Sequence, residues 1–512
     1  MKRLLAAGAA CLAMASAAQA QTQTLAPQAA PADASASAPR PMDQPRDWSA
    51  TLAQDATALH DLMVDSHPGA HDPLNPAFRP RLDHGLTVAL ERARTTTDAG
   101  GWWWALRAYV ADFEDGHVAI NVTQPNFGFA TRWPGFLTIY SGADQVVADR
   151  DEGDATTPPL GARLIDCDGV AANTLAEQRI GQFRGRWFLE SQRVLYGDWQ
   201  FLESQNPWIG ELRQCRFEVD GAARSYALTW RATPEDFNAR RTRLAQRAHP
   251  DFGLRPLDDG GFWISTPSFN GDPASAAHAS LTTLLADMTA RQQALRAAPY
   301  LVLDLRGNGG GTSGWGELMA QILWGDDWMA AHVQSGSDAV DWRASDGNIA
   351  HVSELLAGFR ASNSQAEYII WAETTLNGMT AARAAGQPYW RSANGEPSGQ
   401  EAASPPPAPR LLAGHVYVLT DSLCASACLD TVDIWKAAGG IQIGRETSAD
   451  TVYMDIRETV LPSGLAGVAL PMKVYRGRVR GNNEPHRPTY LIEGDMTDDA
   501  AILAFIRGLK PD

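Results

Sequence analysis

The sequence predicts an α/β protein with a helical N-terminal domain and a smaller module of short strands. Three observations point to this class. Apolar residues recur at helical spacing between residues 47 and 132. Short strand patterns separated by glycine-containing turns follow over residues 133–235. From residue 250 to residue 512, strand patterns alternate with helical ones, which is typical of helices that cover a sheet.

Length and composition exclude several classes of protein. A chain of 512 residues is too long for one core. It is 44% apolar and 20% charged, and no apolar run after residue 20 is long enough to span a membrane. The formal net charge of −16 argues against a nucleic-acid partner, because phosphate binding needs a basic surface. We therefore expect neither a nucleic-acid partner nor stable membrane insertion of the mature chain.

The N-terminus predicts export. Lys2 and Arg3 precede an Ala/Leu-rich run that ends in Ala18-Gln19-Ala20, so residues 1–20 have the pattern of a cleavable signal peptide. Lipid anchoring at Cys11 is disfavoured because Gly8 stands where such a signal has leucine. Residues 21–46 are rich in Ala, Pro, Ser and Gln and predict a disordered leader. We expect a periplasmic or secreted protein.

The helical segment, residues 47–132, contains several histidines. Four of them lack acidic partners at a metal-binding spacing, so surface or capping roles are favoured and no metal is expected: His60, His67, His71 and His84. A fifth, His117, follows the turn residues Asp115 and Gly116, between a predicted helix and a predicted strand. This junction makes His117 a candidate functional residue.

An exported chain can form disulfides. Cys167 and Cys215 lie in two strand-like segments of the 133–235 module, and we expect that they can pair. Cys424 and Cys428 are four residues apart, and two alternatives stay open for them: a bridge, or two small buried thiols that pack a helix start, which we favour. No histidine is spaced to complete a zinc site with either pair.

Two stretches of the 250–512 region contain candidate functional residues. YLVLDLRGNGGG is a buried strand that enters a glycine-rich turn at residues 308–311, where backbone N–H groups can approach a ligand closely. Residues 414–430 predict a strand followed by a helix, with Ser426 at the corner between them. The region also contains an apparent insertion at about residues 325–410, to which the sequence assigns no chemistry. Its aromatic side chains could line or cover a cleft: Trp342, Tyr368, Trp371 and Trp390.

A serine nucleophile needs a base, a group that orients the base, and donors for the developing oxyanion. The sequence offers one candidate for each role. Ser426 is the nucleophile, His117 the base and Glu484 the orienting group. The oxyanion donors are the backbone N–H groups of Gly309 or Gly310 and of Ala427.

Two motifs resemble those of the tail-specific, or C-terminal processing, protease family of serine peptidases. They are DLRGNGGG at residues 304–311 and VLTDSLCASAC at residues 418–428. His67-Pro68, the DGH at residues 115–117, the GARLIDCDGV of a PDZ-like module and the PSF at residues 267–269 also fall where that family has such elements. The resemblance implies a crotonase/ClpP-like ββα core, a PDZ-like module at residues 133–235, a peptide or protein substrate, and no cofactor. It fixes no oligomeric state.

The chain departs from the Ser-Lys branch of that family. That branch has a lysine in a Gly-Lys-Gly turn about two dozen residues after the serine, where this chain has Thr447 to Thr451 without a lysine. Lys436 is in the same predicted helix as Ser426, about 15 Å along its axis. The chain is more similar to the tricorn protease core, which implies His117 and Glu484 as partners of Ser426. The match at Glu484 is loose, and Leu429 replaces the glutamate of the serine motif.

Three functions remain open from the sequence. The first is an exported endopeptidase that captures its substrate by strand addition to the PDZ-like module. The second is a binding protein for a small apolar ligand, because retinoid-binding relatives share this scaffold and the aromatic insertion would suit such a ligand. The third is an esterase that uses the same Ser-His pair.

Overall fold

The computed structural model describes residues 42–124, 127–244, 250–333, 337, 339–362, 366–393 and 409–510. The predicted signal peptide and the leader as far as residue 41 lie outside these residues. Met42, expected in the leader, is buried against the helical domain, and its N–H donates to Gln124 Oε1 at 2.8 Å. The structure confirms the predicted α/β class with a helical N-terminal region.

Three helices form the N-terminal domain: α2 (Trp48–Ser66), α3 (Phe78–Ala93) and α4 (Ala99–Ala111), with the short η1 (Pro68–His71) between the first two. Asp47 and Asp98 cap α2 and α4 by accepting from the N–H groups of Ala50 and Gly101. The apolar faces of the helices meet in one buried cluster, which also takes in side chains from Leu461 to Leu470 of the core domain. The helical domain therefore shares its core with the rest of the chain.

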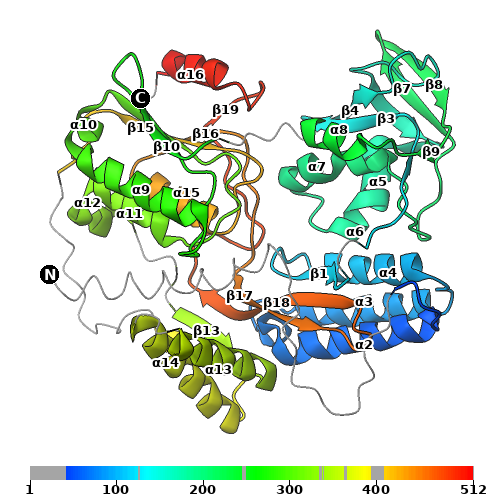
Figure 1. Cartoon of the computed structure of the whole chain (residues 1–512), viewed down its shortest axis with the longest axis horizontal. Coiled ribbons are helices and arrows are strands. Elements are labelled where there is room, and N and C mark those ends of the chain that lie inside the picture. Colours follow the sequence, from blue (N-terminus) through cyan, green and yellow to red (C-terminus); the bar gives the residue numbers. More distant parts are fainter. Residues whose placement is uncertain are drawn as a thin grey trace.

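The strand-rich module stands above these helices in Figure 1. Its sheet has the order β3 (Phe136–Ser141), β4 (Asp144–Arg150), β5 (Arg163–Cys167), β7 (Gln214–Val219) and β8 (Ala222–Ala227), with β6 (Val170–Ala171) paired to β5. A disulfide joins Cys167 and Cys215 at directly paired positions of β5 and β7, as the sequence allowed. The smaller elements are β2 (Arg132–Trp133), β9 (Arg231–Ala232), α5 (Ala172–Ala176), η2 (Glu177–Gly181), α6 (Gln182–Arg184), α7 (Glu190–Tyr196), η3 (Gly197–Phe201) and α8 (Phe237–Leu244).

A largely parallel sheet forms the centre of the third part. Its order is β10 (Gly253–Pro256), β11 (Phe262–Ser265), β12 (Tyr300–Asp304), β15 (His415–Thr420), β16 (Ile441–Gly444) and β19 (Tyr490–Leu491), and only β10 is antiparallel to its neighbour. One face is covered by α9 (Ala276–Ala290), α10 (Gln292–Ala297), α11 (Gly314–Trp324), α12 (Asp326–His332) and α15 (Ala427–Ala437), and the other by α16 (Asp499–Gly508). Burial on both faces explains the continuous apolar runs of β12 and β15.

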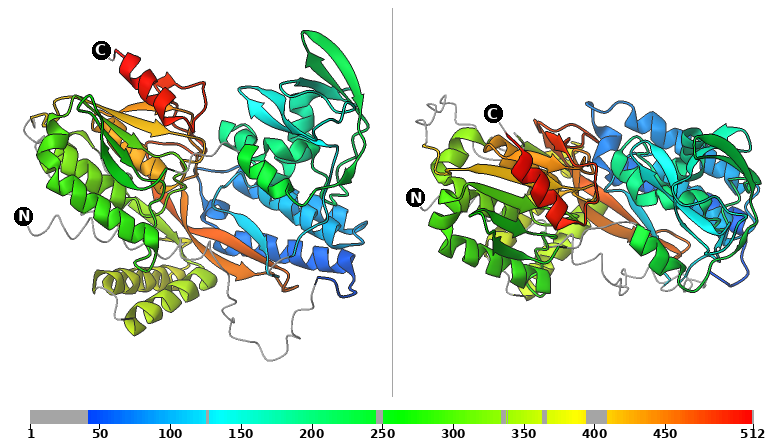
Figure 2. Two further views of the ribbon diagram at one scale, coloured as in Figure 1. Left: turned by 45° about the horizontal axis from the view of Figure 1, so that its top comes forward. Right: turned by 90° about the horizontal axis from the view of Figure 1, so that it is seen from above.

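A second sheet connects this core to the helical domain. Its central strand is the long β18 (Ala466–Arg476), which pairs with β1 (Ala119–Val122), β13 (Ala339–Arg343) and β17 (Tyr453–Val460); β14 (Tyr389–Ala393) adds to β13. The β17–β18 hairpin extends from the core domain toward α2 and α3 (Figure 2). Because β1 directly follows His117, its pairing with β18 holds the His117 segment against the core domain.

The aromatic insertion is part of the fold. Residues 325–410 contribute β13, β14, α13 (Asp346–Ala361) and α14 (Ala366–Ala384). Trp342 and Trp371 lie 5.9 Å apart between ring centroids, and a Cβ at Gly378 would come within 2.1 Å of the Trp390 ring. These aromatic side chains therefore pack with one another, and Tyr368 packs against Phe359. The expectation that they line or cover a cleft is not met, because they serve as a local core.

Candidate active site

Ser426 lies in the turn between β15 and α15, as the sequence predicted. Its φ of 54° and ψ of −123° are strained for a residue with a Cβ, at a cost of about 1–3 kcal/mol. The N–H of Leu429 donates to the Ser426 carbonyl at 2.8 Å, so the serine directly precedes the first turn of α15. This strained strand-turn-helix geometry is typical of a nucleophilic serine.

The glycine-rich turn packs directly against Ser426. Gly310 has φ +101°, and a Cβ there would lie 2.8 Å from Ser426 Cβ and 2.9 Å from the nitrogen of Ala427. Only glycine fits at this contact. The N–H of Gly310 donates to Asn308 Oδ1 at 2.9 Å, whereas Gly309 is exposed to open space. Of the expected oxyanion donors, Gly309 and Ala427 are therefore better suited than Gly310, because the first N–H groups of a helix lack intrahelical partners.

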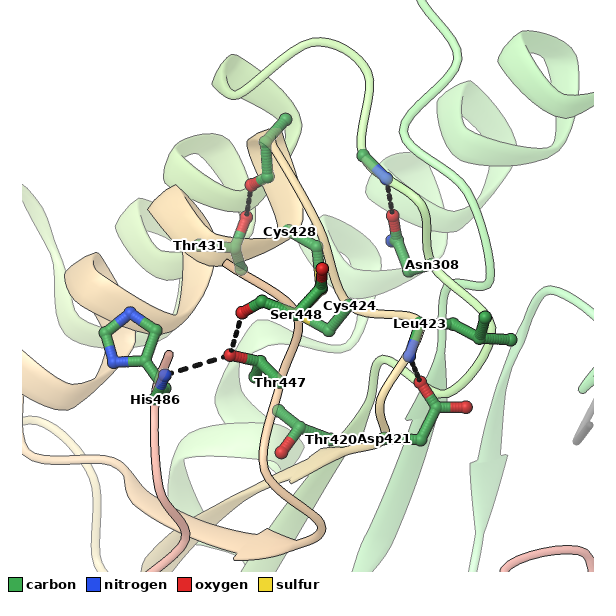
Figure 3. The surroundings of a disulfide bond; sticks show 12 residues. Asn308, Thr420, Asp421, Leu423, Cys424, Cys428, Thr431, Thr447, Ser448 and His486 are labelled. Atoms are coloured by element: carbon green, nitrogen blue, oxygen red, sulfur yellow. Dashed lines mark hydrogen bonds between the residues drawn. A yellow bond between two sulfur atoms is a disulfide. The ribbon is translucent and has the colours of Figure 1, made fainter. Parts of the chain in front are cut away.

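Asn308 and Asp421 fix the two loops relative to each other (Figure 3). Asn308 Nδ2 donates to the Thr266 carbonyl at 2.7 Å, and the Asn308 carbonyl accepts from the N–H of Ala425 at 3.3 Å. The Asp421 carboxylate accepts from the N–H of Gly307 at 2.9 Å and of Leu423 at 3.0 Å. Neither side chain was predicted to have a role, although both lie within the two motifs.

Burial, together with the nearby Asp304, raises the pKa of Asp421 to about 6. The two backbone donors and Arg306 act in the opposite direction and do not offset the desolvation. Ionisation of this carboxyl, which joins the serine loop to the glycine loop, therefore costs free energy at neutral pH.

A disulfide between Cys424 and Cys428 brackets Ser426 (Figure 3). The favoured expectation of two free thiols is therefore corrected. Both residues are fully buried, as expected, and their Cα atoms lie 5.3 Å apart, a separation that one turn at the helix start provides. The N–H of Ser448 donates to the Cys424 carbonyl at 3.0 Å, so the loop that replaces the Gly-Lys-Gly turn packs on the same corner.

Two lysines of the core domain, Lys436 and Lys473, have polar partners of their own. Lys436 lies in the last turn of α15, and its Nζ donates to Gln442 Oε1 at 3.3 Å. Lys473 Nζ pairs with Asp455 at 2.9 Å on β18.

His117 follows a buried histidine-aspartate pair. His67 Nδ1 accepts from the N–H of Gly69 at 2.9 Å, so its proton lies on Nε2, which donates to Asp115 Oδ2 at 3.3 Å. Asp115 Oδ1 accepts from the His117 N–H at 2.8 Å and lies 3.7 Å from His117 Nδ1. Burial opposes ionisation of Asp115, but the hydrogen bond from His67 and the two imidazoles hold its pKa below the ordinary value. Asp115 thus holds the backbone of the His117 loop, whereas the buried Nδ1 of the His117 ring has no hydrogen-bond partner among the described residues.

His67 has the capping role that the sequence favoured, but its side chain is fully buried. Glu484 lies in an adjoining loop. Its carboxylate is exposed and accepts from the N–H of Gly481 at 2.8 Å. The neighbouring Asn483 donates to the Glu114 carbonyl at 2.8 Å, which joins the Glu484 loop to the loop that carries His117.

The serine and histidine loops face one cavity of about 290 Å³. Asp115, Gly116 and Val118 lie on one side, and the residues that precede the nucleophile, Ser422, Leu423 and Ala425, lie on the other. The strand-rich module supplies the third wall, from Phe183 to Tyr196. Its Arg186 packs on Gly116 and donates to the Ala449 carbonyl at 2.6 Å, which joins all three parts of the chain.

Two further kinds of feature are absent from the described residues. No group of three or more histidine, cysteine or acidic side chains could hold a metal ion in the part of the chain that the structure describes. Within that same part, no helix combines the length and apolar character needed to cross a membrane.

Comparisons with known proteins show what the chain is similar to. The model of peptidase family S41 matches residues 263–479, which include the glycine-rich turn and Ser426. No curated protein matches the sequence. The crystal structure of mature CPAF is 12% identical, with a TM-score of 0.55 over 90% of this chain and 97% of that one. The structure of mature CPAF complexed with lactacystin is 11% identical, with a TM-score of 0.54 over 86% of this chain and 93% of that one.

Proposed function

Because residues 263–479 match the model of peptidase family S41, we propose that the chain is an exported serine endopeptidase of this family, with Ser426 as nucleophile. The observation that carries the assignment is the strained backbone of Ser426, packed on Gly310 inside the matched segment. A peptide or protein is the substrate that the family implies.

In the proposed mechanism His117 removes the proton from Ser426 Oγ as the oxygen attacks the scissile carbonyl carbon. The N–H groups of Gly309 and Ala427 stabilise the oxyanion. His117 then protonates the departing amine, which leaves an acyl-enzyme on Ser426. A water molecule, deprotonated by His117, hydrolyses this ester and restores the serine.

Two carboxylates are proposed to support His117. Asp115 is already 3.7 Å from its Nδ1 and holds its backbone N–H. Glu484 remains a proposed third member, because its loop is bonded to the His117 loop through Asn483. Since Glu484 now bonds to its own turn, that role requires its side chain to turn toward His117 when substrate binds.

We propose that the module at residues 133–235 is PDZ-like and captures an extended peptide by strand addition. The edge strand β8 supports this role, because most of its side chains are exposed and it pairs on one side with β7 only. The two disulfides support export, because such bonds persist in oxidising compartments. A periplasmic or secreted location follows as a proposal.

Amide hydrolysis against a library of unstructured peptides tests this function, with p-nitrophenyl esters in parallel. We expect wild-type protein to cleave internal peptide bonds and Ser426→Ala to cleave none. Asp115→Asn should lower kcat by about 10- to 100-fold with little change in KM, because the neutral amide has only one acceptor oxygen for the two donors that the carboxylate now holds. Glu484→Gln should do the same only if Glu484 reaches His117 in the complex.

The exposed Asp61→Asn is the matched control, since Asp61 also lies beside a histidine, His60, but does not line the cavity. If the protein hydrolyses esters but cleaves no peptide, the proposed function becomes that of an esterase and not of a peptidase. Absence of both activities in a folded protein would favour a binding function, although no described aromatic cluster of the insertion is left open for a ligand.

A further inference from the structure

Two arginines that line the cavity, Arg107 of α4 and Arg184 of α6, have no carboxylate partner among the described residues. The two helices that carry them pack against each other (Figure 1). The contacts of both guanidinium groups are with aromatic faces. Arg107 lies 5.8 Å from the Trp103 ring, and Arg184 lies 4.0 Å from the Trp199 ring and 4.7 Å from the Tyr196 ring.

The acidic side chains around them are already engaged. Glu114 accepts from Arg81 at 2.7 Å, and Asp115 is held by His67 and His117. Asp198 pairs with Arg241. The two arginines therefore bring positive charge to the cavity, which Asp198 offsets only in part.

This arrangement has an electrostatic cost. Desolvation lowers the pKa of Arg107 and of Arg184, and the Arg107 charge lowers that of Arg184 further. Arginine nevertheless stays protonated in proteins, so two like charges share a partly desolvated space. An anion that entered the cavity would relieve the repulsion and accept hydrogen bonds from both guanidinium forks.

The position of the cavity indicates which molecule carries such an anion. Its opposite wall is formed by Ser422, Leu423 and Ala425, the last of which precedes the nucleophile. A peptide placed for attack by Ser426 must pass this wall. A volume of about 290 Å³ holds one acidic residue and excludes a folded ligand.

We propose that Arg107 and Arg184 form a subsite that binds a carboxylate of the peptide substrate close to the scissile bond. The subsite makes the peptidase selective for acidic sequences. This inference rests on the proposed peptidase function and adds the substrate class to it. The carboxylate comes from an aspartate or glutamate side chain or from the C-terminus of the peptide, and the two sources are separable by experiment.

The test uses the full chain and a peptide library whose C-termini are amidated, together with the same peptides as free acids. We expect wild-type protein to cleave amidated peptides with Asp or Glu at one position near the cleaved bond at least about tenfold more efficiently, in kcat/KM, than those with Asn or Gln there. A preference that appears only for free acids assigns the subsite to the terminal carboxylate.

Variants connect the preference to the two side chains. Arg107→Gln/Arg184→Gln should lose the preference, and Arg184→Glu should invert it toward Lys or Arg at the same position. Arg291→Gln, at an exposed arginine that ends α9, is the control and should keep the wild-type pattern. Circular dichroism and thermal unfolding identify any variant that fails to fold.

Wild-type protein that cleaves neutral peptides without any acidic preference would overturn the subsite and leave the peptidase function standing. A preference for acidic peptides that survives in folded Arg107→Gln/Arg184→Gln would also overturn the subsite and leave the peptidase function standing. If wild-type protein cleaves no peptide, the proposed function falls and the subsite falls with it.

Discussion

Individual side chains determine how the nucleophile is held. Ser426 keeps a strained backbone because its neighbours on both sides are fixed: Asn308 binds the N–H of Gly310, and Asp421 binds those of Gly307 and Leu423. Asp421 does so from a buried position that disfavours its charge. Asp421 thus aligns the serine loop with the glycine loop, although its ionisation in this buried position is unfavourable.

This cost predicts a dependence of stability on pH. The folded pKa of Asp421, about 6, lies above its ordinary value of 3.8, so the folded protein holds this proton more tightly than the unfolded chain. Its contribution to the free energy of unfolding is full below about pH 4 and is lost as the pH rises through 6. Relative to the non-titrating Asp421→Asn, wild-type protein should lose about 2 kcal/mol between pH 4 and pH 8.

Urea unfolding of the two proteins at both pH values measures this difference. Asp61→Asn, at an exposed carboxyl, should show no comparable change and serves as the control. A wild-type to Asp421→Asn gap that is constant across this range would mean that Asp421 is not shifted upward.

At the scale of elements, the two disulfides have different tasks. Cys167–Cys215 joins neighbouring strands across a separation of 48 residues, whereas Cys424–Cys428 closes a separation of four around the nucleophile. In the chain-entropy model the longer loop contributes about 4 kcal/mol to stability and the shorter about 2 kcal/mol. The shorter bridge, however, encloses the turn that carries the proposed nucleophile.

Removal of the longer bridge should therefore affect stability more, and removal of the shorter bridge should affect activity more. Cys167→Ser/Cys215→Ser should lower the free energy of unfolding more, and Cys424→Ser/Cys428→Ser should lower kcat more, by about tenfold or greater, because the serine turn loses its constraint. Unfolding curves and peptide hydrolysis of the two double variants, each the control of the other, measure both effects. Equal activity of the two variants would show that the bridge at Ser426 has no part in positioning it.

Sequence patterns predicted the helices, strands and loops better than they predicted the contacts between these elements. Continuous apolar runs marked β12 and β15, and the glycines and small residues after them marked both active-site loops. The pairing of Cys424 with Cys428 was not predictable, because a spacing of four suits a bridge and two packed thiols equally. The insertion was misjudged because aromatic side chains form a local core as readily as they line a cleft.

At the scale of the whole molecule, the site is assembled from three parts of the chain. His117 reaches the core because β1 pairs with β18, and Arg186 of the module binds both the Gly116 turn and the Ala449 carbonyl. Such long-range contacts leave no periodic signal in the sequence. This is why Ser426 and His117 were identifiable as motif residues, while Arg186 and the Arg107–Arg184 pair emerged only from the fold.

The most direct test of the account is covalent labelling by a fluorophosphonate, with the modified residue mapped by tandem mass spectrometry. We expect the label on Ser426 in wild-type protein and its loss in folded His117→Ala, while His84→Ala, a control at another histidine of the helical domain, should label as wild type does. A label on Ser422, which lies in the same peptide and lines the cavity, would contradict the assignment of the nucleophile. Undiminished labelling of Ser426 in His117→Ala would contradict the assignment of the base.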